Sequence, residues 1–92
     1  MPSHIPERKF TAADLVAGGT YRVVATFEDY DGTVHPVGEC WRFLEKSFLP
    51  YDDGLSLFVE REGQKVQLRL QWRAETQGQI IDGFSDLVEE VA

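Results

Sequence analysis

Apolar and polar residues alternate without a break in the second half of segment 55–72, LSLFVEREGQKVQLRLQW, and this pattern constrains the fold more than any other feature. Alternation with period two is typical of a β-strand with one buried face. If residues 62–63 form the turn of a hairpin, Leu57 pairs with Leu68 and every apolar pair lies on one face. A three-residue turn would place Leu57 opposite Gln67, because a slip of one residue turns a strand inside out. The sequence therefore predicts a hairpin with an even-numbered turn.

Shorter strands are expected before this hairpin. Residues 20–28 predict a first strand, a short strand follows around Val34, and residues 40–46 predict a third strand. The segments DYDG at 29–32 and PYDDG at 50–54 separate them, because Asp bonds its own backbone and Gly accepts positive φ. Five short strands are too few for a sandwich. We therefore expect a mainly β fold, a small five-stranded antiparallel SH3-like barrel that is partly open, with a short N-terminal helix and a C-terminal helix.

The N-terminal region predicts a loose tail followed by a short helix. Residues 1–9 contain two prolines that block regular structure, so we expect the single domain to span 10–92. Thr11 is placed to cap a helix whose third residue is Asp14. The glycines at 18–19 are expected to end this helix after about two turns.

The segment after Trp72 changes from period two to the helical period, which predicts a closing helix. Gly83 weakens the middle of that helix, so two shorter pieces are an alternative to one continuous helix. The apolar positions of the helical stripe are Ile80, Ile81, Phe84, Leu87, Val88 and Val91.

Composition limits the classes of partner and the compartment. The chain has 92 residues and a formal net charge of −7, which disfavours nucleic acid and anionic membranes and favours a basic protein or peptide. Cys40 is the sole cysteine, so no internal disulfide forms. No secretion signal and no apolar run of about 18 residues is found. We expect a cytoplasmic protein, and the sequence leaves its oligomeric state open.

Acidic turn residues are the first candidates for a site, because several oxygen ligands in one place suit a hard cation. The spacing does not match the calcium loop of an EF-hand, since the best alignment puts Phe27 and Gly38 where the two anchoring acids belong. Asp and Gly are also ordinary turn formers. We therefore predict no metal and no cofactor. The acids considered are Asp29, Asp31, Glu39, Asp52 and Asp53.

His35 and Cys40 are a second candidate, either as soft-metal ligands or as a base and a thiol nucleophile. With His4 they supply at most three soft ligands, whereas a structural zinc site has four. A nucleophile would also need an oxyanion hole and an orienting group. We interpret Cys40 as a small buried hydrophobe and His35 as a loop residue bonded to backbone. No catalytic residue is predicted.

The aromatic residues are more numerous than a core of this size needs. Phe58 falls on the polar face of the hairpin among cations, and we expect the closing helix to cover it. The cations of that face fit either a solvated face that guards a sheet edge or an anion or partner site. The predicted binding residues combine aromatic side chains with the acidic turns. They are Asp29, Tyr30, Asp31, His35, Trp41, Tyr51, Asp52, Asp53 and Phe58.

Four motifs, DYDG at 29–32, HPVGECW at 35–41, PYDDGLSLF at 50–58 and RLQW at 69–72, resemble a small bacterial family catalogued only as a domain of unknown function. The resemblance covers residues 15–90 and implies a standalone bacterial domain, with no assigned activity or site. We therefore hypothesise a non-enzymatic interaction or ligand-binding module whose partner is a protein or peptide, basic in character. The alternative is a small enzyme or metal-binding protein that uses the acidic turns and His35.

Overall fold

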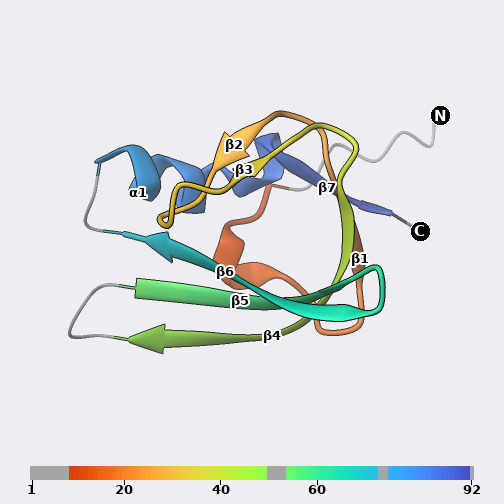
Figure 1. Cartoon of the computed structure of the whole chain (residues 1–92). Helices are drawn as coiled ribbons and strands as arrows, with labels where there is room; N and C mark the ends of the chain where they lie inside the picture. Colours follow the sequence, from red (N-terminus) through yellow and green to blue (C-terminus); the bar gives the residue numbers. More distant parts are fainter. Residues whose placement is uncertain (1–8, 50–53, 73–74, 92) are drawn as a thin grey trace, which may run out of the picture.

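The computed structural model describes residues 9–49, 54–72 and 75–91, and within them the fold is mainly β (Figure 1). The strands of the main sheet are β1 (Thr20–Val23), β4 (Cys40–Leu49), β5 (Gly54–Arg61), β6 (Gln64–Gln71) and β7 (Val88–Val91). They form an open antiparallel sheet in the order β6-β5-β4-β1-β7. A separate two-stranded sheet pairs β2 (Phe27–Glu28) with β3 (Val34–His35). The predicted class, a mainly β fold with a five-stranded antiparallel sheet, is confirmed.

The hairpin register predicted from the alternation is confirmed. Leu57 pairs with Leu68 and Leu55 with Leu70 across β5 and β6. The two turn residues have positive φ, 53° at Glu62 and 81° at Gly63, as a type I′ turn requires. These pairs place one row of apolar side chains in the core.

Strand membership differs from the expectation in two places. The segment predicted as one strand over 20–28 bends between β1 and β2, because the amides of Val24 and Ala25 both donate to the Leu87 carbonyl, at 2.7 and 3.1 Å. Val34 consequently belongs to the separate hairpin of β2 and β3. The fifth strand of the main sheet is instead β7, from the segment that was expected to be helical.

Strand β4 curves the sheet around the core. Its 10 residues contact β1 near the start and β5 along most of its length, and the register shifts between Phe43 and Glu45. This shift is a β-bulge, which bends the bulged strand. Trp41 and Phe43 precede the bulge and are both buried. The strand also continues three residues beyond the predicted end at Lys46.

The N-terminal helix is shorter than predicted. Thr11 and Asp14 form the expected capping box, but the helix is a single 3-10 turn, η1 (Ala12–Asp14). The Val16 amide donates to the Tyr21 hydroxyl at 2.9 Å instead of continuing the helix. The Tyr21 side chain, buried in the core, thereby ends the helix before the glycines at 18–19.

The closing segment is α1 (Glu75–Asp82), a 3-10 turn η2 (Phe84–Asp86) and then β7. The prediction that Val88 and Val91 continue a helical stripe is wrong. These β-branched residues flank two glutamates and pair with β1, whose edge would otherwise be open. Ile81 and Phe84 cover the apolar face of the sheet together with Phe27 of β2. No helix among the described residues is long and apolar enough to span a bilayer.

The Glu62→Asn substitution is expected to raise the free energy of unfolding by roughly 0.5–1 kcal/mol, because Asn tolerates the left-handed conformation better than Glu. Urea unfolding followed by tryptophan fluorescence measures the change. Gln64→Asn, at the exposed first residue of β6, is the matched control and should give no gain. A loss of stability in Glu62→Asn would contradict the turn assignment.

Candidate functional site

The DYDG motif forms the turn of the β2–β3 hairpin. One carboxylate oxygen of Asp29 accepts hydrogen bonds from the amides of Asp31 and Thr33, each at 3.0 Å. Gly32 has a φ of 86°, a value that favours glycine. The motif is therefore explained by turn chemistry, and it directs the second oxygen of Asp29 toward His35.

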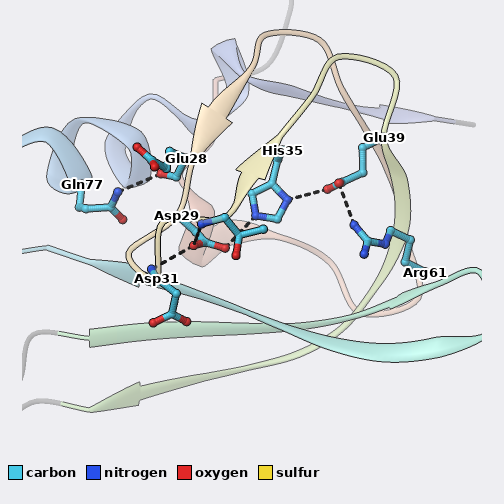
Figure 2. Close-up of polar contacts among 8 residues, drawn as sticks. Glu28, Asp29, Asp31, His35, Glu39, Arg61 and Gln77 are labelled. Atoms are coloured by element: carbon cyan, nitrogen blue, oxygen red, sulfur yellow. Dashed lines mark hydrogen bonds and ion pairs between the residues drawn. The ribbon is translucent and has the colours of Figure 1, made fainter.

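A buried polar network surrounds His35, which is 2% exposed (Figure 2). Its Nε2 lies 2.8 Å from Asp29 Oδ2, and its Nδ1 lies 2.7 Å from Glu39 Oε2. The second oxygen of Glu39 accepts from the Arg61 guanidinium at 2.8 Å. The network thus joins the β2–β3 hairpin, the loop before β4 and the end of β5.

The network is balanced in charge when the His35 ring is an imidazolium. A neutral ring would leave one nitrogen lone pair facing a carboxylate oxygen, whereas the imidazolium donates to both carboxylates. Asp29 and Glu39 then match the positive charges of His35 and Arg61. The Phe27 ring stacks on His35 with centroids 4.9 Å apart, which suits a cation on an aromatic face.

Further contacts dock the hairpin against β6 and α1. The Tyr30 amide donates to the Arg69 carbonyl at 2.7 Å, and the Arg69 guanidinium donates to Asp31 at 3.1 Å. From the helix, the side-chain amide of Gln77 donates through Nε2 to the Glu28 backbone carbonyl at 2.9 Å (Figure 2). The exposed part of the motif therefore also holds the hairpin in place.

This geometry corrects two interpretations and limits the chemistry of the network. His35 is a buried strand residue bonded to carboxylates, not a loop residue bonded to backbone. Cys40 is exposed, not buried. Both ring nitrogens of His35 are engaged, so neither is free to take a proton from a substrate. Among the described residues, no group of three or more His, Cys, Asp or Glu is arranged to hold a metal ion.

The other predicted binding residues do not join this network. Trp41 is buried in the core beside Tyr21, with ring centroids 5.7 Å apart. Phe58 lies on the opposite face of the sheet beneath the Lys65 amine, 5.1 Å from the ring centroid. The expectation that the closing helix covers Phe58 is wrong, because that helix packs on the apolar face. The remaining predicted binding residues, Tyr51, Asp52 and Asp53, lie outside the described residues.

Sequence reasoning missed Arg61 as a member of the network. From the sequence, Glu39 is considered only as a candidate metal ligand, although Glu39 follows His35 by four residues. Arg61 is separated from Glu39 by 22 residues, and no local pattern connects them. Only the folded sheet brings the two side chains together.

A second feature is an open cleft of about 670 Å³ between residues 9–16 and β7. Lys9 at one end is paired with Asp86 at 3.0 Å, and Glu89 is paired with Arg22. Glu90 has no ion-pair partner among the residues that the structure describes, and its carboxylate lies beside Gly19, where a Cβ would come within 3.2 Å of it. The cleft has a mostly polar lining with three acids, Asp14, Glu89 and Glu90. Its accessible apolar side chains are the exposed Val16 and the partly buried Phe10, whereas Tyr21 and Val88 are buried beneath it.

Comparison with known proteins places the chain among relatives without an assigned activity. The model of the family described as a domain of unknown function, DUF3601, matches residues 6–91. The solved structure of integron cassette protein VCH_CASS4, from the mobile metagenome of Vibrio cholerae, is similar with a TM-score of 0.82 and 33% identity. The match covers 90% of this chain and 93% of that chain. No curated protein matches. The predicted resemblance to a family of unknown function is confirmed.

Replacing His35 by Ala is expected to lower the free energy of unfolding by about 3–5 kcal/mol, because two buried carboxylates lose their partner. Urea unfolding measures the loss. Val34→Ala is the matched control in the same strand, and it should change stability by less than about 0.5 kcal/mol because Val34 is exposed. A loss near that of the control would mean that the network does not hold the hairpin.

Proposed function

The chain belongs to the DUF3601 family, and we propose that it is a non-enzymatic interaction module that binds a basic segment of a partner protein. The observation that carries the proposal is the cleft between residues 9–16 and β7, with its acidic rim and the exposed apolar side chain of Val16. A cytoplasmic setting is part of the proposal.

The size and walls of the cleft suit one or two side chains of a peptide. A volume of about 670 Å³ lies within the range of known ligand sites. The Phe10 ring is partly buried and meets the core ring of Tyr21 edge to face at 6.2 Å, and the neighbouring Val16 is exposed. A peptide side chain that packs on Val16 and Phe10 would lose water without requiring the core to open.

Charge favours a basic segment over other partners. The whole chain carries a formal net charge of −7, which accelerates encounter with a cation. Glu90 supplies the local contact, because its carboxylate borders the cleft and no described cation pairs with it. A lysine or arginine of the partner would neutralise it, whereas an acidic segment would be repelled.

We also propose the finer description of the fold as an SH3-like, partly open barrel. Its support is the strand order, in which β7 pairs with β1 and the strands β1, β4, β5 and β6 follow as neighbours. Small barrels of this kind often bind extended peptides. The tryptophan pair and the closing Pro and Tyr of proline-binding grooves are missing from the sequence, so a proline-rich partner is not expected.

Two other hypotheses about the function of this chain receive less support. Tyr30 is 50% exposed at the hairpin tip and stays a predicted contact residue, but its neighbour Asp31 is already paired with Arg69. A small enzyme or metal-binding protein using the acidic turns and His35 is the alternative function. Both ring nitrogens of His35 are engaged by carboxylates, which weighs against that alternative.

The test is a titration of the ¹⁵N-labelled chain with the peptide acetyl-Lys-Thr-Val-Thr-Lys-amide, alongside acetyl-Glu-Thr-Val-Thr-Glu-amide. The lysine peptide should shift the amide resonances of residues 9–16 and β7, and the glutamate peptide should not. Glu90→Gln is expected to weaken binding about fivefold, since a partly exposed ion pair contributes about 1 kcal/mol.

The matched control for charge is Glu62→Gln, which removes the same charge from the β5–β6 turn. The affinity of this variant for the lysine peptide should stay within about twofold of that of the unchanged protein, because salt screens the interaction between Glu62 and a peptide bound in the cleft. Equal losses in the two variants would mean that net charge alone attracts the peptide. Changes in amide resonances that occur only at residues outside the cleft would overturn the proposal.

A further inference from the structure

We infer that the partner segment binds as an added β-strand on the free edge of β7, so that the main sheet gains a sixth strand. The inference rests on the proposed function and specifies how the basic segment is recognised. Strand addition provides affinity through main-chain hydrogen bonds and specificity through alternate side chains.

The hydrogen-bond pattern shows which groups of β7 are available. In an antiparallel pair, every second residue of a strand directs its N–H and C=O groups to the neighbouring strand, and the residues between direct theirs to the other side. The Val24 amide donates to the Leu87 carbonyl at 2.7 Å, and the register continues without a bulge. The Leu87 carbonyl and both the N–H and C=O groups of Glu89 therefore face β1, whereas the Leu87 amide donates to the Phe84 carbonyl at 2.9 Å. The N–H and C=O groups of Val88 and Glu90 point away from β1, where the described chain offers no backbone partner.

The opposite edge of the sheet is a poorer acceptor for a strand. The β2–β3 hairpin rests on the edge of β6, where the Tyr30 amide already donates to the Arg69 carbonyl. The edge of β7 instead borders the cleft, so a strand added there would also lie beside the acidic rim.

The side-chain pattern of β7 specifies the sequence of the added strand. Val88 lies opposite Val23 and Glu90 lies opposite Tyr21, so these side chains share the face that borders the cleft. A strand beside β7 would present alternate residues to the same face. Val88 is fully buried and offers no free apolar surface, so the recognition falls on Glu90, which is exposed and beside which a basic residue of the added strand fits.

Charge argues against a second copy of this chain as the occupant. Antiparallel pairing of β7 with itself would bring Glu89 against Glu89 or Glu90 against Glu90 of the copy, according to the register, and like charges across a strand pair are destabilising. Each copy also carries a formal net charge of −7. The two glutamates thus guard the edge against self-association and select a basic strand.

The test uses two N-methylated forms of acetyl-Lys-Thr-Val-Thr-Lys-amide, one methylated at valine and one at the second threonine, which remove N–H groups on opposite edges of the strand. Strand addition predicts that one of them binds about tenfold or more weakly, because its methyl group meets β7, while the other stays within about threefold. Amide resonances of β7 report the binding. If both forms bind equally well or are equally weakened, strand addition is overturned and the proposed function stands.

Three further outcomes would each overturn the inference. Failure of the parent peptide to bind removes the proposed function together with it. A dimer in sedimentation velocity that the peptide dissociates would identify a second copy as the occupant. In the full-length variant Ile5→Pro, a peptide affinity raised about tenfold would identify residues 1–8 of this chain as the occupant, since proline cannot donate to a ladder.

Discussion

The burial of one face of a five-stranded open sheet is the constraint on which the rest of the structure depends. The hairpin of β5 and β6 directs its apolar row to one side, and an open sheet leaves that row exposed unless other segments cover it. Phe84 of the closing segment and Phe27 of the β2–β3 hairpin meet over it, with ring centroids 5.5 Å apart. The position of this second hairpin is therefore decided by the need to complete the core.

The β2–β3 hairpin brings charged side chains into the layer that covers the sheet. The hydrogen bonds of the His35 network make the burial of these charges tolerable. Buried carboxylates are costly unless they are paired and hydrogen-bonded. Asp29 meets this requirement through two backbone amides and the His35 ring. A motif with the residue types of a catalytic site thus holds the hairpin in place, and the recognition surface that we propose lies along β7, in residues with no motif.

The edge of β7 combines two requirements that natural sheets often satisfy with the same residues. Charged side chains on an edge strand prevent uncontrolled pairing, and they also decide which strand is accepted. Glu90 occupies the space left by Gly19 and has no ion-pair partner in the described part of the chain, so in the proposed binding mode it would serve both purposes at one position.

The sequence by itself determined the β5–β6 register, the DYDG turn and the Thr11–Asp14 cap, because each depends on residues close together in the chain. Only the tertiary structure decided that His35 is buried between two carboxylates, because one of these, Glu39, is held by Arg61, which lies on another strand. It also decided that residues 88–91 form a strand, although their apolar spacing fits a helix. The open edge of β1 supplied the hydrogen-bond partners, and a segment with weak local preference adopts the structure whose backbone groups are satisfied by its neighbours.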